Sequence, residues 1–242
     1  MSRAAFTRAD QRWLLTQSAG LLLIACLLLG IFENTLLDVR LSQFFYDAGT
    51  HTFPWQHSWF FDSFMHHGLK SASFLLGFLA LIACGFGWRG HLAWLPPHNA
   101  LLAAAGIILI PLLTSTIKQL TNRHCPWDVV DFGGFAPYVS LFADTPGDIV
   151  RGVCFPAGHA SAGFVWIILA VALRATKPRL ANWTLICGLL AGMFLGLGRM
   201  AQGAHFLSHI LWSGWFAWAL SLALATVFRV PVVTPANKGS HQ

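Results

Sequence analysis

The chain has 242 residues, of which 56% are hydrophobic and only 10% are charged, with a formal net charge of +6. A soluble domain normally carries about a quarter charged residues, so this composition excludes an ordinary soluble fold. Together with a mean hydropathy of +0.61, it predicts an all-α membrane protein.

Apolar runs that are long enough to cross a bilayer recur along the chain, since roughly 20 apolar residues span the hydrocarbon layer. The sequence predicts six spans, at Trp13–Phe32, Ser71–Trp88, Asn99–Ile117, Ser161–Ala175, Trp183–Gly198 and Ile210–Phe228. The fourth and fifth runs are short or rich in glycine, so we expect them to extend into flanking residues. The first run is long and no small-residue cleavage site follows it, so we interpret it as a retained span and not as a signal peptide.

Two long segments, roughly 33–70 and 118–159, join predicted spans and lie on one side of the membrane. Long loops that are not linkers usually carry function. The first contains the aromatic stretch Phe53–Phe64, which predicts a surface-lying element at the lipid headgroups or an ordinary aromatic belt. We expect one membrane domain over residues 1–242.

Lysine and arginine gather on the side that holds both termini. That side carries nine basic residues and one acid, whereas the side of the long loops carries six basic residues and eight acids. The nine are Arg3, Arg8, Arg12, Arg89, Arg174, Lys177, Arg179, Arg229 and Lys238. The positive-inside rule therefore predicts cytoplasmic termini and outer loops that face the periplasm of a bacterial inner membrane. The net charge then reflects orientation, and no nucleic-acid partner is predicted.

The cysteines divide into two groups. Cys26, Cys84 and Cys187 fall within predicted spans, where cysteine behaves as a small apolar residue. Cys125 and Cys154 both lie in the second outer loop. They would either form a disulfide in an oxidising compartment, tying the two ends of the loop together, or remain free thiols.

Polar residues that suit phosphate chemistry cluster at three places, in Lys118–Asp128, Cys154–Ser161 and Gly198–His209. Lys118, Arg123 and Arg199 would bind phosphate oxygens. Since imidazoles exchange protons near neutral pH, His159 and His205 would provide attack and proton transfer. Each residue alone has a simpler interpretation, such as a lysine that reaches the headgroups from a span end. It is the joint pattern at one membrane face that favours phosphoryl transfer.

A metal site is the alternative interpretation of the third cluster. His205 and His209 are four residues apart, which on a helix places both on one face, as some zinc sites require. A third ligand at a suitable spacing is not evident in the sequence. We therefore predict no metal and no cofactor.

These clusters resemble the three motifs of the type-2 phosphatidic acid phosphatase family. The family motifs read Lys–six residues–Arg-Pro, then Pro-Ser-Gly-His, then Ser-Arg–five residues–His–three residues–Asp. The matching residues here are Lys118, Pro126, Pro156, Gly158, His159, Arg199 and His205. The resemblance implies six spans, an outer-facing site and a phosphohistidine intermediate. By the same resemblance His205 is the nucleophile, His159 is the general acid, and Lys118 and Arg199 bind phosphate.

The chain departs from these motifs at four positions, Cys125, Ala157, Gly198 and His209, where the family has Arg, Ser, Ser and Asp. We expect Arg123 to reach the phosphate from a different backbone position. His209 would accept a hydrogen bond from His205 but adds no negative charge. Asp128 or Asp131 is the acid expected to replace the lost aspartate by folding of the loop.

The predicted function is hydrolysis of a lipid phosphate monoester or diphosphate, such as undecaprenyl diphosphate, a lipid A phosphate or a glycerophospholipid phosphate. The alternatives are a lipid-to-lipid phosphotransferase that uses the same site, and a catalytically impaired protein that binds lipid phosphates. A transporter is disfavoured because the ionisable residues lie at span ends and not at mid-membrane depth. The expected partners are the lipid substrate and membrane lipids, and no sequence feature sets the oligomeric state.

Overall fold

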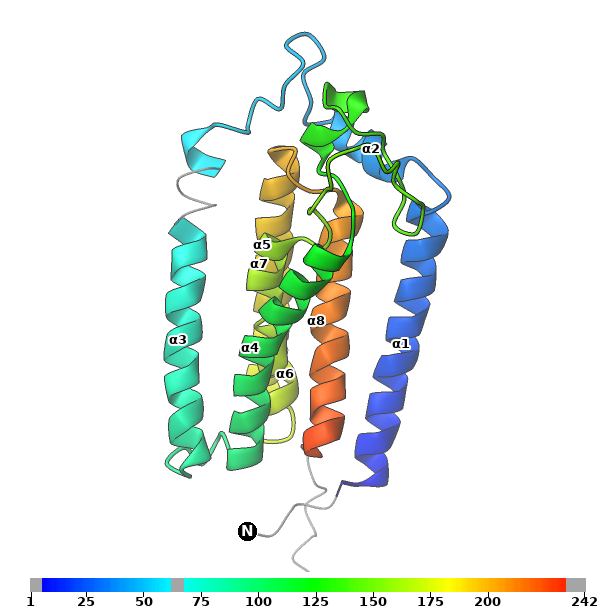
Figure 1. Ribbon diagram of the computed structural model, residues 1–242. Helices are drawn as coiled ribbons and strands as arrows, with labels where there is room; N and C mark the ends of the chain where they lie inside the picture. The colour runs from blue at the N-terminus through cyan, green and yellow to red at the C-terminus, as the bar shows by residue number, and fades with distance from the viewer. Residues whose placement is uncertain (1–5, 62–67, 234–242) are drawn as a thin grey trace, which may run out of the picture.

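The computed structural model describes residues 6–61 and 68–233, and within these residues the fold is helical, with isolated β-bridges but no strands (Figure 1). The helices are α1 (Arg8–Phe32), α2 (Leu37–Gln43), α3 (Leu69–Trp88), α4 (Pro97–Leu120), α5 (Gly158–Phe164), α6 (Ile167–Leu173), α7 (Pro178–Ala201) and α8 (Leu207–Phe228). Two 3₁₀ turns, Pro126–Asp128 and Val130–Phe132, lie in the second long loop. The all-α prediction is confirmed for this part of the chain.

Five of the helices are long and apolar enough to cross a membrane, namely α1, α3, α4, α7 and α8. They match five of the six predicted spans, and most extend further into the flanking residues than predicted. The predicted fourth span forms instead a shorter apolar segment, Gly158–Leu173. A turn at Val165 and Trp166 breaks it into α5 and α6, so a sixth span stays a prediction.

Helix α8 lies at the centre of the bundle and contacts α1, α2, α4, α5, α6 and α7 (Figure 1). Helix α3 stands at the edge beside α4. The two long loops gather at one end of the bundle, the upper end in Figure 1, and α2 lies among them. This arrangement carries the ends of α4 and α7 and the start of α8 to the same end.

Close approach of the helices depends on small residues, as is usual in membrane bundles. A Cβ added to Gly192 in α7 would lie 2.2 Å from the Phe164 ring of α5, and one added to Gly163 would lie 2.3 Å from the Gly192 nitrogen. A Cβ added to Gly106 of α4 would lie 2.2 Å from the Ile168 side chain of α6. The glycines that make the fifth predicted span weakly apolar are therefore contact points of the bundle.

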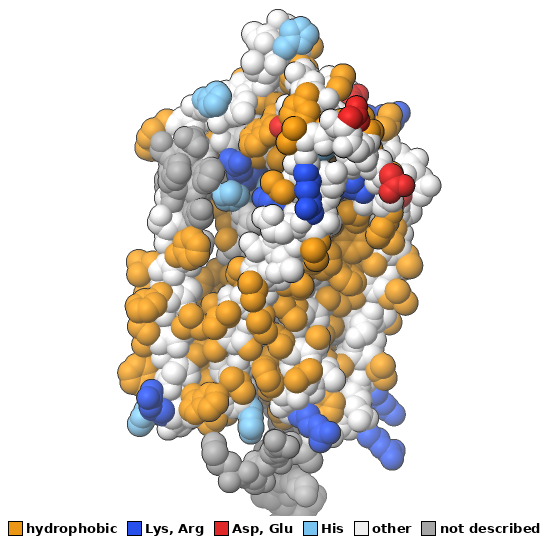
Figure 2. Space-filling model, viewed as in Figure 1, with side chains coloured by type: hydrophobic (Ala, Val, Ile, Leu, Met, Phe, Trp, Pro, Cys, Tyr) orange, Lys and Arg blue, Asp and Glu red, His pale blue; other side chains and the backbone are white. Residues whose placement is uncertain are grey.

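The outer surface of the bundle is apolar along its middle, with charged side chains at the two ends (Figure 2). Large hydrophobic side chains there are strongly exposed, including Leu22 of α1, Phe74 of α3 and Leu190 of α7. Exposed apolar surface on this scale is what a helix bundle presents to lipid.

The end of the bundle opposite the long loops holds the first and last described residues. Asp10, near the start of α1, accepts hydrogen bonds from the backbone N–H groups of Val232 at 2.8 Å and Val233 at 2.9 Å, just after α8. Both ends of the described chain therefore lie on one side. Arg3 and Lys238, which the positive-inside prediction counts on this side, fall outside the described residues.

The first long loop packs onto the bundle through an aromatic cluster. Phe53 is 3% exposed and stacks with Tyr46 and Phe132 at ring-centroid distances of 5.3 and 5.4 Å. Its ring also fills the space beside Gly203, whose φ of +75° favours glycine. Farther along, Trp59 is 72% exposed, as expected for a side chain at a headgroup layer. Residues 62–64 of the predicted surface element lie outside the described residues.

Candidate functional site

The three predicted polar clusters meet at the loop end of the bundle. Lys118 lies in the last turn of α4, and His159 lies in the first turn of α5. Arg199 lies in the last turn of α7, and His205 lies in the short connection from α7 to α8. Lys118, His159 and Arg199 all act on His205 electrostatically, so residues from distant parts of the sequence form one site.

The segment that precedes His159 is fixed by hydrogen bonds to both other clusters. The Thr121 hydroxyl donates to the Phe155 carbonyl at 2.6 Å, and the Cys154 N–H donates to the Arg123 carbonyl at 2.8 Å. On the other side, the Ala157 N–H donates to the His209 carbonyl at 3.2 Å. These bonds tie the end of α4, the start of α5 and the start of α8 together.

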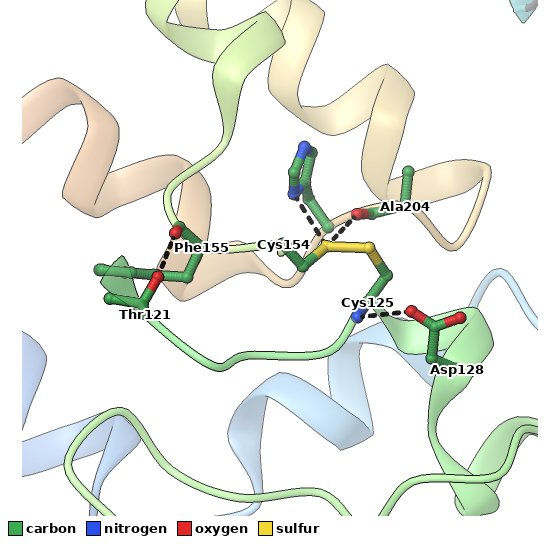
Figure 3. The surroundings of a disulfide bond; sticks show 7 residues. Thr121, Cys125, Asp128, Cys154, Phe155 and Ala204 are labelled. Atoms are coloured by element: carbon green, nitrogen blue, oxygen red, sulfur yellow. Dashed lines mark hydrogen bonds between the residues drawn. A yellow bond between two sulfur atoms is a disulfide. The ribbon is translucent and has the colours of Figure 1, made fainter. Parts of the chain in front are cut away.

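Cys125 and Cys154 form a disulfide with an S–S distance of 2.08 Å (Figure 3). Cys154 is fully buried, and its Sγ lies 3.5 Å from Nδ1 of His205. The Asp128 carboxylate accepts a hydrogen bond from the Cys125 N–H at 3.2 Å (Figure 3). Cys125 stands where the family motif has arginine, so the first motif is here attached covalently to the second, directly beneath His205.

Arg123 is bound by the second long loop. Its Nε donates to the Leu141 carbonyl at 3.1 Å, and NH1 donates to the Asn122 carbonyl and the Thr145 hydroxyl. NH2 donates to the carbonyls of Leu141 and Ala143. Because a guanidinium has five N–H donors, this set occupies all of them. The structure therefore favours a clamp on the loop over the predicted phosphate ligand.

Arg199 lies between the two long loops. Its NH1 donates to Oε1 of Gln202 at 2.8 Å, and its guanidinium carbon lies 5.7 Å from the centre of the Trp127 ring. Gln202, which is 1% exposed, donates in turn to the Gln56 carbonyl of the first loop at 3.1 Å. Gln56, Gln202 and Trp127 thus position the guanidinium, and sequence reasoning missed all three.

The two histidines of the third cluster are buried, His205 to 3% exposure and His209 to 6%. Burial lowers the pKa of His205, and the nearby charges of His209, Lys118, Arg199 and His159 lower it further. His205 is therefore held as neutral imidazole, the form that can attack an electrophile.

His205, His209 and Cys154 also offer three atoms within 4.8 Å of one another, close enough for a metal. Metal sites use the thiolate form of cysteine. Since the Cys154 sulfur is joined to Cys125, this set provides only two ordinary ligands. The predicted absence of a metal stays a prediction.

An apolar cavity of about 540 Å³ opens beside Lys118 and His159. Its walls are formed by α3, α4, α5 and Leu195 of α7, with Phe74, Phe78, Ile107 and Val165 among the lining residues. Lys118 and His159, the predicted phosphate ligand of α4 and the predicted general acid, are among its lining residues, and most of the other lining residues are apolar. A molecule with a phosphate and a hydrocarbon tail has the matching shape and polarity.

A buried acid that the sequence did not single out, Asp38, contacts the start of α8 and lines a small cavity with His209. Its carboxylate accepts hydrogen bonds from the Ser208 N–H at 2.9 Å and from the Ser208 hydroxyl, in the first turn of α8. Asp128, one of the expected acids, is engaged by Cys125, and Asp131 is exposed. Both expected acids lie on the 3₁₀ turns of the second long loop, whereas Asp38 contacts the first turn of α8.

Two comparisons with known proteins identify relatives of this chain. The model of the PAP2 superfamily matches residues 99–231, more than half of the chain. A protein named lipid A 4'-phosphatase, from Francisella tularensis subsp. novicida (strain U112), is 27% identical over 198 residues, which cover 78% of this chain and 83% of that protein. No solved structure matches. The chain belongs to the PAP2 superfamily, the type-2 phosphatidic acid phosphatases.

Proposed function

From membership of this superfamily, we propose that the protein is an integral-membrane lipid phosphatase that works through a phosphohistidine on His205. The single observation that carries the proposal is the apolar cavity of about 540 Å³ that Lys118 and His159 help to line. It joins a cation and a proton carrier to a space that suits hydrocarbon. A soluble phosphate ester has no hydrocarbon chain to contact such apolar walls.

In the proposed reaction, Nε2 of His205 attacks phosphorus, because Nδ1 is turned toward Cys154. The P–N bond forms as the bond from phosphorus to the lipid oxygen breaks, and His159 gives that oxygen a proton. Water then attacks the phosphohistidine while His159 takes its proton, which releases inorganic phosphate and restores His205. Lys118 and Arg199 hold the phosphate oxygens, where charge is concentrated in the transition state.

Lipid A phosphates are the first candidate substrates, because the similar Francisella protein is named for that activity. Undecaprenyl diphosphate and glycerophospholipid phosphates remain alternatives of the same chemistry. We place the site at the periplasmic face of a bacterial inner membrane, as the distribution of lysine and arginine predicts. With Gly158–Leu173 as a short sixth span, the domain covers residues 1–242.

The test is phosphate release by the full chain, purified in detergent, from a panel of these lipid phosphates. We expect the His205→Ala variant to lose at least about 1000-fold in kcat, since the attacking group works as part of a unit. His91→Ala is the matched control, because His91 is exposed in the loop between α3 and α4 at the opposite end of the bundle. Equal release by wild type and His205→Ala would refute the mechanism.

Two other outcomes separate the alternatives. Phosphate that appears on a second lipid, and not in solution, would identify a phosphotransferase. Binding of lipid phosphates without release from any of them would identify an impaired binding protein.

A further inference from the structure

Asp38 is a buried carboxylate that the proposed reaction does not yet use. It lies in the first turn of α2 and is only 2% exposed. Its two oxygens accept the N–H and the hydroxyl of Ser208, and Tyr138 hydrogen-bonds to the same carboxylate. Burial of an acid is costly unless its partners compensate. The Asp38 carboxylate bonds to the start of α8 at Ser208, which lies between His205 and His209 in the sequence.

The surroundings of Asp38 connect it to the histidine pair. Asp38, Tyr138, His124 and His209 line one cavity of about 20 Å³, which has room for about one water molecule. The rings of His205 and His209 lie 6.0 Å apart, and Phe206 between them in sequence packs on His209 at 5.4 Å and on Tyr138 at 5.2 Å. The bonds from Ser208 to Asp38 therefore hold the first turn of α8, which contains His209 and begins two residues after His205.

The electrostatic need for an acid here follows from the reaction. When His205 attacks phosphorus, its imidazole gains positive charge. The groups that act on it, Lys118, Arg199, His159 and His209, are cationic or neutral. The first turn of α8 adds the positive end of a helix dipole. The family motif offsets such charge with an aspartate, but this chain has His209 at that position.

We propose that Asp38, on α2, is a positioning residue that supplies the negative charge which the aspartate of the third motif provides in the family. Its carboxylate fixes the first turn of α8 through Ser208 and compensates the charge that develops on His205. This inference rests on the proposed phosphohistidine reaction and deepens it.

The acid has a pH signature that a purely structural residue lacks. Burial raises the pKa of Asp38 to about 6, so the carboxylate is lost as the pH falls through that value. The other titratable or charged groups around it are His209 on α8, His124 and Tyr138 on the second loop, Glu33 at the end of α1, and Arg40 on α2 itself. We expect wild-type kcat to fall below about pH 6.

The test is Asp38→Asn, which keeps the shape and an acceptor for the Ser208 N–H but removes the charge. We expect kcat to fall at least roughly tenfold, a conservative bound against the ~10⁴-fold loss seen when a serine protease triad loses its aspartate charge. The fall below pH 6 should disappear from the remaining activity. Thermal unfolding at pH 7.5 should be unchanged or shifted upward, because the substitution removes a buried charge. Asp131→Asn, an exposed acid on the same side, is the matched control.

A second variant makes the inference independent of any folding defect. Adding His209→Asp to Asp38→Asn returns a carboxylate to the family position, and we expect it to recover kcat at least severalfold over Asp38→Asn alone. Wild-type kcat and pH profile in Asp38→Asn, or no recovery in the double variant, would overturn the role of Asp38. An inactive wild type, or an unaffected His205→Ala, would instead refute the proposed function.

Discussion

Breaking the disulfide between Cys125 and Cys154 should lower the activity of the protein by loosening the loop beside His205. The bond closes a segment whose ends are 29 residues apart. In the chain-entropy model, closing such a loop removes about 12 cal/mol/K of entropy from the unfolded chain, or about 3.6 kcal/mol at 25 °C. That value applies to the unfolded chain and is an upper bound for the loop, because α4 and α5 already hold its two ends in the folded bundle. Losing the bond would therefore raise the open fraction of the loop by up to about 400-fold, since each 1.4 kcal/mol is a factor of ten. The Cys154 sulfur 3.5 Å from His205 would also be released from its position.

The assay is phosphate release, measured with and without a dithiol reductant, alongside alkylation of cysteines followed by mass spectrometry. We expect reductant to lower wild-type activity at least tenfold and to expose Cys125 to alkylation. A variant with Cys26, Cys84 and Cys187 changed to alanine should respond like wild type. The double variant Cys125→Ser, Cys154→Ser should be weakly active and insensitive to reductant. Full activity in this double variant, or after verified reduction, would refute the reasoning.

Two other substitutions test how the site and the bundle are held. Arg123→Lys should open the second long loop to limited proteolysis, because an ammonium has three donors where the guanidinium uses five. Arg199→Lys should instead lower kcat/KM while the loop stays protected. The reverse pattern would show that Arg123 binds phosphate. Gly192→Leu should destabilise the bundle by about 1–3 kcal/mol or more, because a Cβ at this position would lie 2.2 Å from the Phe164 ring. Gly20→Leu in α1 should leave the melting temperature unchanged, because nothing lies within 4 Å of a Cβ there. Equal effects of the two substitutions would refute the close contact.

Composition and apolar run length predicted most of the helices because lipid imposes one requirement on every span. A helix that crosses hydrocarbon must be long and apolar whatever its neighbours are. Periodicity does not reveal a break such as the one at Val165 and Trp166, since both residues are apolar. The break lies where α5 packs on α7 through Gly163 and Gly192, and where Gly188 of α7 faces Trp166 and Ile167. A single span does not encode such tertiary contacts.

The site was predictable where function depends on residue type and spacing along one segment. The five residues between Arg199 and His205 complete α7 and begin the short connection to α8. Both side chains therefore lie at one helix end, so sequence alone could pair them. The roles of Arg123 and Asp38 depend on contacts across the fold. Arg123 is occupied by carbonyls 18 to 20 residues away, and Asp38 meets Ser208 across 170 residues. An acid in a long loop carries no sign of such a partner.

Two of the departures from the family motifs are accompanied by other groups in this chain, and both of these groups depend on the second long loop. With cysteine in place of the motif arginine, a covalent bond to Cys154 replaces a charged contact, and Arg123 is free to organise the loop that this bond closes. With His209 in place of aspartate, we infer that the negative charge comes from α2, which the same loop covers through Tyr138. Both replacements require an ordered second long loop. It follows that loop opening, by reduction or by Arg123→Lys, should impair Asp38-dependent catalysis before it unfolds the helices.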